Sequence, residues 1–309
     1  MHQPASPRKT VVAQSPGSLR VAFAALIVAN VMLAFGSWFV RLADTGPVAS
    51  AFWRIALATP ILLAAAMVGG WRPRRLSRGM WVLFALAGVC FAADLGAWHI
   101  GILQTTLANA TLFGNSATLF FPVYGFLAAR ALPTRMQGIA LALATIGAAL
   151  LMGRSYQLDP KNLVGDLLCL VAGLLYTFYF IVMLRVRERL DSLPALALAT
   201  GASILPLLLL AILLGERIWP HNWAPLIALA LVSQVVGQAL LIYALGKLSP
   251  LVVGIALLVQ PVVAATVGLI VYNERLGAPD LAGAVLVAVA LVLVRDRPAP
   301  LAPAEAGSR

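Results

Sequence analysis

The chain has 309 residues, of which 61% are hydrophobic and 11% charged, and its mean hydropathy is +0.94. Such a composition leaves too little charged surface to cover a soluble domain, so it argues against soluble enzymes and binding modules and indicates a protein that lives in lipid. The net charge of +11 could suggest a nucleic-acid partner. However, the basic residues gather in short segments between apolar runs, which is the pattern of topology determinants in a membrane protein.

Apolar runs of spanning length follow one another along the chain. A helix needs about 20 apolar residues to cross roughly 30 Å of hydrocarbon. A membrane β-barrel would show short alternating segments, whereas runs such as LALATGASILPLLLLAILL are continuously apolar. We therefore predict an all-α polytopic membrane protein with ten transmembrane helices. The expected spans are Val21–Val40, Val48–Val68, Met80–Leu103, Leu107–Ala129, Met136–Met152, Leu163–Leu184, Leu193–Leu214, Trp223–Leu245, Leu251–Tyr272 and Ala278–Val294.

An internal repeat divides these spans into two sets of five. Leu245–Leu276 lines up without gaps on Gly101–Leu132. Because each half has an odd number of spans, the second half enters the bilayer in the opposite orientation, so two inverted five-helix repeats are expected. The predicted parts are a disordered N-terminal tail (1–20), a first repeat (21–153), a connecting loop (154–162), a second repeat (163–295) and a disordered C-terminal tail (296–309).

The distribution of basic residues predicts the orientation. If the N-terminus is cytoplasmic, most of the 22 Lys and Arg residues, among them Arg72, Arg130 and Arg187, fall in cytoplasmic segments. Both termini are then cytoplasmic. The expected location is the bacterial inner membrane, as a multi-pass protein.

Two sequence signatures carry a family resemblance. The first copy contains Trp98-x-x-Gly101, Thr105, Ala108, Ala110 and Arg130-Ala131-Leu132, and the second contains Ala244-Leu245, Ser249-Pro250, Gln260-Pro261 and Glu274-Arg275-Leu276. These residues resemble the EamA-domain proteins of the drug/metabolite transporter superfamily. Trp98-His99, Gln104-Thr105-Thr106 and Ala108-Asn109-Ala110-Thr111 are similar to its aromatic amino-acid exporter branch. The resemblance implies a central cavity that is surrounded by the first four helices of each half.

Polar groups at membrane depth are the candidate substrate ligands, because burying them in lipid is costly unless they face protein or water. In the fourth span, Thr111, Asn115, Thr118 and Pro122 form an i, i+4, i+7, i+11 stripe on one helix face. Polar and aromatic residues of other spans could complete the cavity. The candidate substrate-binding residues are Asn30, Ser37, Trp38, Trp98, His99, Thr111, Asn115, Thr118, Tyr176, Tyr179, Gln234, Gln238 and Gln260.

Each candidate also has a structural interpretation. Ser and Thr often satisfy carbonyl groups of their own helix, and Asn and Gln also join neighbouring helices. Aromatic side chains can simply pack. A small-residue stripe in the fifth span, which includes Gly138 and Thr145, favours close helix packing or a homodimer interface.

Arg54 and Asp94 are the charged residues expected deep within spans. Counted along their helices, both lie roughly 10 Å or more below the membrane surface, so they could form an ion pair. If they pair, Asp94 stays ionised and transport is expected to depend little on protons. If Arg54 instead extends outward, Asp94 becomes a candidate coupling site.

Amides and hydroxyls beside aromatic walls suit a small zwitterion with an apolar side chain. The favoured hypothesis is export of amino acids, aromatic or hydrophobic ones first, by alternating access. No G-x-x-x-x-G-K-[ST] loop occurs, so transport is expected to be secondary or facilitative, without cofactor or metal. The alternatives are another metabolite or a lipophilic drug as substrate and, remotely, an intramembrane enzyme, for which H-E-x-x-H and G-x-S-x-G motifs are missing.

Overall fold

The computed structural model describes residues 16–72, 76–105, 110, 113–153, 163–272 and 278–294. Thr111, the connecting loop 154–162 and most of the predicted tails lie outside the described residues, although α1 begins at Pro16, within the expected N-terminal tail. Every regular element in the described ranges is a helix. The elements are α1 (Pro16–Ala34), α2 (Gly36–Leu42), α3 (Pro47–Val68), α4 (Arg78–Gln104), α6 (Ala117–Ala129), α7 (Arg135–Gly153), α8 (Leu163–Arg187), α9 (Ser192–Leu213), α10 (Ala224–Ala228), η2 (Leu229–Gln238), α11 (Ala239–Leu245), α12 (Pro250–Ala256), α13 (Val259–Tyr272) and α14 (Ala278–Val294).

Six helical segments within the described ranges are long and apolar enough to cross a membrane. They are α1 with α2, then α3, α4, α8 and α9, and finally the continuous run α10–η2–α11. The other four predicted spans contain α6, α7, α12 with α13, and α14, whose described residues do not meet the same criterion. The all-helical membrane architecture is therefore confirmed, and the count of ten spans stays a prediction.

Helix starts follow local capping chemistry. Ser77 precedes α4, and its side chain accepts a hydrogen bond from the Met80 amide at 3.3 Å. Ser249 precedes α12 and accepts from the Val252 amide at 3.4 Å, with Pro250 at the first helical position. A capping hydroxyl satisfies one of the free amides at a helix start, and proline there loses no hydrogen bond. Both helices accordingly begin within two residues of the predicted spans.

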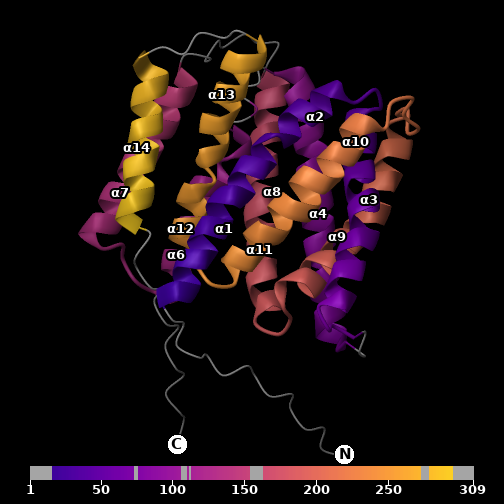
Figure 1. The fold of residues 1–309 in the computed structure, drawn as a ribbon, viewed down its shortest axis with the longest axis horizontal. Coiled ribbons are helices and arrows are strands. Elements are labelled where there is room, and N and C mark those ends of the chain that lie inside the picture. The colour runs from indigo at the N-terminus through magenta and orange to yellow at the C-terminus, as the bar shows by residue number, and fades with distance from the viewer. Residues whose placement is uncertain are drawn as a thin grey trace, which may run out of the picture.

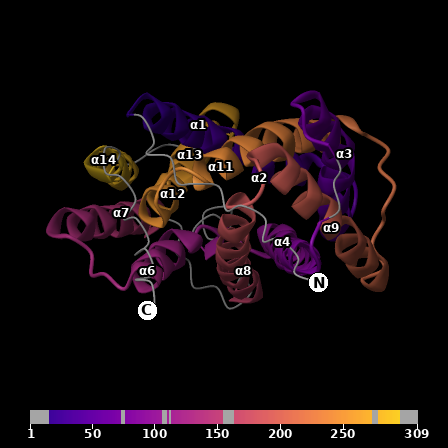
Figure 2. The same ribbon diagram turned by 90° about the horizontal axis from the view of Figure 1, so that it is seen from below.

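Helices from the two halves of the chain pack against one another. The main contacts are between α3 and α9, α4 and α8, α4 and α9, α6 and α12, α7 and α14, and between α1 and the run η2–α11. Figure 2 shows α7 and α14 at one edge of the bundle and α3 and α9 at the other, with α4 and α8 nearer the middle. The buried apolar core draws on both halves, from Leu26 of α1 to Ala290 of α14.

The first and last described helices define one end of the bundle. In Figure 1, α1 begins and α14 ends at the lower edge, and we call this the near end. The loops 43–46 and 214–223 lie at the opposite, far end, where α2 and α9 finish and α3 and α10 start. The two described ends of the chain thus lie at the same end of the bundle.

Reciprocal carboxylate contacts hold the two far-end loops together, and we call this arrangement the clasp. Asp44 accepts hydrogen bonds from the backbone amides of His221 at 2.8 Å and Asn222 at 3.3 Å. The His221 amide lowers the pKa of the half-buried Asp44 carboxyl below its ordinary value. Glu216 in turn accepts from the amide of Ala49 at 2.8 Å, in the first turn of α3. A carboxylate at a helix N-terminus satisfies free amides and complements the helix dipole.

Candidate functional site

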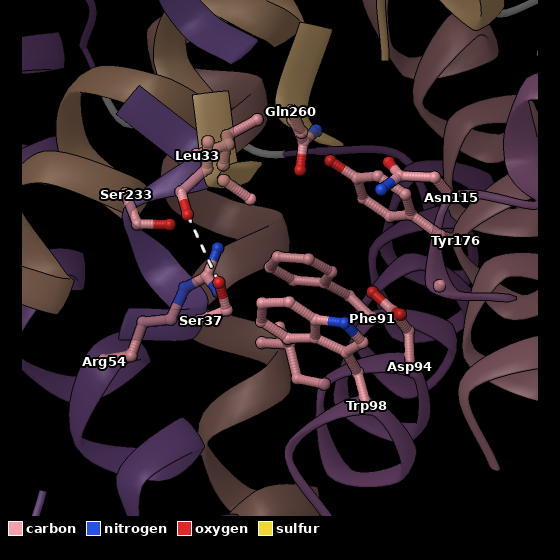
Figure 3. A pocket seen from close by; sticks show the side chains of 14 residues that line it. Leu33, Ser37, Arg54, Phe91, Asp94, Trp98, Asn115, Tyr176, Ser233 and Gln260 are labelled. Carbon is pink, nitrogen blue, oxygen red and sulfur yellow. Dashed lines mark hydrogen bonds between the residues drawn. The ribbon is translucent and has the colours of Figure 1, made fainter. Parts of the chain in front are cut away.

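A cavity lies among α1, α2, α3, α4, α8, η2 and α13, with residues 114 and 115 closing one side (Figure 3). It encloses about 650 Å³ of space free of protein atoms, counted together with its mouth. Its lining residues are Leu33, Ala34, Ser37, Arg54, Phe91, Asp94, Leu95, Trp98, Gly114, Asn115, Tyr176, Ser233, Gln260 and Ala264.

Arg54 supplies the positive charge of the cavity. It is only 3% exposed, and its Nε donates to Gln234 Oε1 at 3.0 Å. Gln234 Nε2 donates in turn to Thr200 Oγ1 at 3.2 Å. This relay from α9 through η2 fixes one edge of the guanidinium. Within the described residues, its two Nη groups bind no acceptor and remain available to an anionic group in the cavity.

Asp94 stands across the cavity from Arg54. Figure 3 shows the rings of Phe91 and Trp98 drawn between the two charged side chains. No nitrogen of Arg54 lies within 4.0 Å of an Asp94 oxygen. The expected direct ion pair is therefore absent from this structure, because Arg54 is turned toward Gln234. Asp94 is 7% exposed, and no described residue donates a hydrogen bond to its carboxylate. The cavity thus presents two separated charges of opposite sign.

An amide pair forms the roof of the cavity as drawn in Figure 3. Gln260 Nε2 donates to Asn30 Oδ1 at 2.9 Å, and Asn30 Nδ2 donates to the Leu26 carbonyl at 2.8 Å. With its nitrogen engaged, Gln260 turns its Oε1 into the cavity, as the red atom shows. Gln260 is therefore a hydrogen-bond acceptor for a ligand. Asn30 lies behind it, fully buried, and orients the Gln260 amide.

Aromatic and small polar side chains complete the walls. Phe91 stacks on Tyr176 with ring centroids 6.3 Å apart. The Tyr176 hydroxyl donates to Gln238 Oε1 at 3.1 Å, which fixes the ring that faces the cavity. The Ser233 hydroxyl is buried and has no partner among the described residues, so it is available to a ligand or a water molecule. Asn115 also lines the cavity, as predicted.

Of the predicted site residues, the structure gathers Ser37, Arg54, Asp94, Trp98, Asn115, Tyr176 and Gln260 around this cavity. Three others support lining residues from behind: Asn30 holds Gln260, Gln234 holds Arg54, and Gln238 holds Tyr176. These three are orienting residues in this structure and not part of the lining.

Four predicted ligands lie elsewhere. His99, a residue of α4, is fully buried against the start of α3. Its Nδ1 is 2.8 Å from Ser50 Oγ and 3.0 Å from the Pro47 carbonyl. Trp38 stacks on Phe39 with centroids 5.5 Å apart. The last two are Tyr179, which is fully buried and stacked on Phe91, and Thr118, which is also buried.

The predicted fourth-span stripe is not a continuous helix face. Residues 115 and 116 form a turn and α6 begins only at Ala117, so helical spacing does not carry from Asn115 to Thr118. Asn115 meets the cavity, whereas Pro122 packs on α12: a Cβ at Gly254 would lie 2.8 Å from its ring. Thr111 lies outside the described residues.

Seven of the lining residues were not predicted from the sequence, and Phe91 and Ser233 are the two of them that bear on ligand binding. Phe91 shows a signal in retrospect, because it lies three residues before Asp94 and seven before Trp98, on one helix face. Ser233 shows no such signal in the sequence, because it belongs to the π-helix η2. In an ideal α-helix, Ser233 and Gln238 would point about 140° apart. In η2, Ser233, Gln234 and Gln238 are all at most 1% exposed. π-helical turns often occur at functional sites.

The fold and this cavity define a helical, multi-pass membrane protein with a polar pocket at membrane depth. Comparisons with known proteins agree. The family model described as the EamA-like transporter family matches twice, over residues 20–153 and 163–295. The chain belongs to this family.

Two relatives extend the match. A protein of Archaeoglobus fulgidus, described as an uncharacterized transporter, is 26% identical over 261 residues, which is 81% of this chain and 89% of the relative. A protein of known crystal structure superimposes with a TM-score of 0.75 at 14% identity, over 91% of this chain and 96% of its own. This structural likeness concerns the fold alone. Neither description names a substrate, so the aromatic amino-acid exporter branch stays a prediction.

Proposed function

We propose that the protein exports amino acids, with aromatic and other hydrophobic ones preferred, across a bacterial inner membrane. The observation that carries this proposal is the separation of Arg54 from Asp94 across a cavity with aromatic walls. A zwitterion places its carboxylate at the Arg54 guanidinium, where charge-assisted hydrogen bonds are strong. Its ammonium group lies between Asp94 and Gln260 Oε1. Its side chain stacks on Phe91 and Trp98.

Alternating access of two inverted repeats is the proposed transport cycle. The helix contacts support it: α3 with α9, α6 with α12 and α7 with α14 each join corresponding elements of the two halves. Two further pairs of contacts exchange under the same relation. The contact of α1 with η2 and α11 corresponds to that of α4 with α8, and the contact of α4 with α9 corresponds to that of α3 with η2. A two-fold axis between inverted halves would produce this pattern.

Proton coupling through Asp94 belongs to the same proposal. A carboxylate without an ion-pair partner in the cavity can hold either the substrate ammonium or a proton, and it exchanges one for the other as the substrate leaves. Among the described residues, the titratable side chains that interact electrostatically with it are Cys90 of its own helix and, from adjoining helices, Arg54 of α3 and Cys169, Tyr176 and Tyr179 of α8.

One observation favours a second candidate substrate. A lipophilic cation needs an apolar cavity with an unpaired carboxylate, and Asp94 is such a carboxylate. Arg54 argues against a cationic substrate, because the substrate would share the cavity with the unneutralised guanidinium.

Binding of phenylalanine analogues to the purified protein tests both proposals. We expect phenylalanine to bind more tightly than phenethylamine, which lacks the carboxylate, and than phenylpropionate, which lacks the amine. Arg54→Gln should abolish the preference for the carboxylate, and Asp94→Asn the preference for the amine. Tightest binding of phenethylamine by the parent protein would favour a cation transporter, and equal binding of all three would contradict both proposals.

A further inference from the structure

A second hollow lies on the outer surface of the bundle, away from the central cavity. It is a groove between α3, α4 and α9, and Thr59, Trp81, Ala85, Gly201 and Leu205 are among its lining residues. Trp81 is 57% exposed and Leu205 62% exposed. All three helices are candidate membrane spans, so the groove faces the acyl region of the bilayer.

The groove is apolar and its floor is closed. The polar groups of its described lining side chains are the Trp81 indole N–H and the Thr59 hydroxyl, and the hydroxyl donates to the Ile55 carbonyl at 2.8 Å. At the floor, α4 and α9 touch, since a Cβ on Gly88 would lie 2.6 Å from the Ala202 Cβ. A Cβ on Gly201 would meet only Thr59, at 3.5 Å, so the space above Gly201 is open. The lining offers few polar partners to water, and an empty groove would lose dispersion contacts.

One face of α4 leads from the groove to the membrane surface. Arg78, Trp81, Ala85 and Val89 follow an i, i+3, i+7, i+11 spacing, which places them on one side of the helix. Arg78 is the first residue of α4 and is exposed. Tryptophan is typical of the membrane interface, and arginine there attracts anionic headgroups. Along α4 the stripe therefore runs from the cationic Arg78, past the indole of Trp81, to the apolar wall of the groove at Ala85 and Val89.

We propose that this groove is a binding site for an anionic glycerophospholipid, with one acyl chain between α4 and α9 and the phosphate at Arg78. The order of charge, indole and apolar wall along α4 matches the order of phosphate, glycerol and acyl chain in the ligand. A second copy of the chain would not require the cation at the end of the groove, so lipid is the occupant that uses every feature of the stripe.

Native mass spectrometry and thermal unfolding of the full chain in detergent test this site, with phosphatidylglycerol and phosphatidylcholine as probes. We expect the protein to retain phosphatidylglycerol and to unfold at a higher temperature in its presence than with phosphatidylcholine. Arg78→Gln should lower the preference for phosphatidylglycerol about fivefold, the effect of one arginine near an anionic surface. Arg135→Gln is the matched control, because Arg135 is likewise the exposed first residue of a helix.

Filling the groove tests the acyl-chain part separately. Gly201→Leu should abolish retention of both lipids, whereas Gly138→Leu should not, since Gly138 also has open space around it but lies on α7. Equal lipid retention by the two leucine variants would overturn the proposal. The proposal would also be overturned if Gly201→Leu left lipid binding unchanged but reduced the oligomeric state of the protein, because the groove would then hold a second copy of the chain.

Discussion

The side-chain amide of Gln234 binds the Arg54 guanidinium, and this hydrogen bond turns Arg54 away from Asp94. The sequence predicted that both Arg54 and Asp94 lie deep in their spans, and it left open whether they pair or Arg54 extends outward. It could not predict the partner of Arg54, because Gln234 and Asp94 lie at similar depth and the choice depends on how each helix is rotated. The structure shows Arg54 Nε bound to Gln234 Oε1, backed by Thr200. The seven predicted residues that do line the cavity were found from polarity and depth, while His99 was misassigned because its Ser50 partner comes from another helix.

Gln234→Leu is predicted to weaken binding of a carboxylate ligand, because Arg54 loses the acceptor that orients it. A hydrogen bond to a charged group contributes about 1.5–3 kcal/mol, so the dissociation constant should rise about tenfold or more. Thr200→Val leaves the Arg54 bond in place and should have a smaller effect. Titration calorimetry on the purified variants measures both. Equal affinities for the parent and Gln234→Leu would remove Gln234 from the account of the site.

Asp94→Asn is predicted to leave abundance and unfolding temperature close to the parent values, because no ion pair with Arg54 is broken. Asparagine has nearly the same shape and removes a buried charge without leaving a partner unsatisfied, so no loss of stability is expected. The same variant should lose proton-driven accumulation while keeping substrate exchange. Strong destabilisation that Arg54→Gln relieves would instead show that the two residues pair in the membrane.

Two elements depart from the simple helices that hydrophobic patterns predict. Residues 229–238 form a π-helix within a span that reads as an ordinary α-helix in the sequence, since hydropathy does not register how the backbone winds. The fourth predicted span contains a turn at residues 115–116 before α6. Elsewhere, the predicted boundaries hold closely, as for α3 and α14, because long apolar runs with proline or polar ends define them.

The contact between α6 and α12 relies on glycines. A Cβ at Gly254 would lie 2.8 Å from Pro122, and one at Gly125 would lie 2.9 Å from Pro250. Gly254→Val should therefore force the two helices apart and destabilise this conformation by about 1–3 kcal/mol. Gly138→Val is the control, since nothing lies within 4 Å of a Cβ there. Thermal unfolding in detergent distinguishes them, and equal unfolding temperatures would show that α6 and α12 separate without cost.

At the scale of the whole molecule, the two halves share one cavity and one clasp. Composition and the internal repeat predicted the all-helical membrane fold and the repeated domain. The clasp could not be predicted, because Asp44 and Glu216 look like ordinary loop residues until the two loops are seen side by side.

Membrane topology follows from the basic residues and is directly testable. Reporter fusions after Arg75 and Arg187 should read cytoplasmic, and fusions after Asp159 and Asn222 should read external. Arg187 and Asn222 fall at opposite ends of the described bundle, at the end of α8 and before α10. A cytoplasmic reading after Asp159 would break the five-span half and remove the inverted repeat.

Uptake into proteoliposomes tests the central claim most directly. Vesicles loaded with unlabelled phenylalanine should take up labelled phenylalanine, tryptophan and leucine from outside by exchange, and an imposed proton gradient should drive net accumulation. Arg54→Gln vesicles, matched for protein content, should show little of this uptake. Parent vesicles that exchange none of these amino acids, but do exchange a labelled lipophilic cation, would contradict the assignment of the cavity to zwitterionic amino acids.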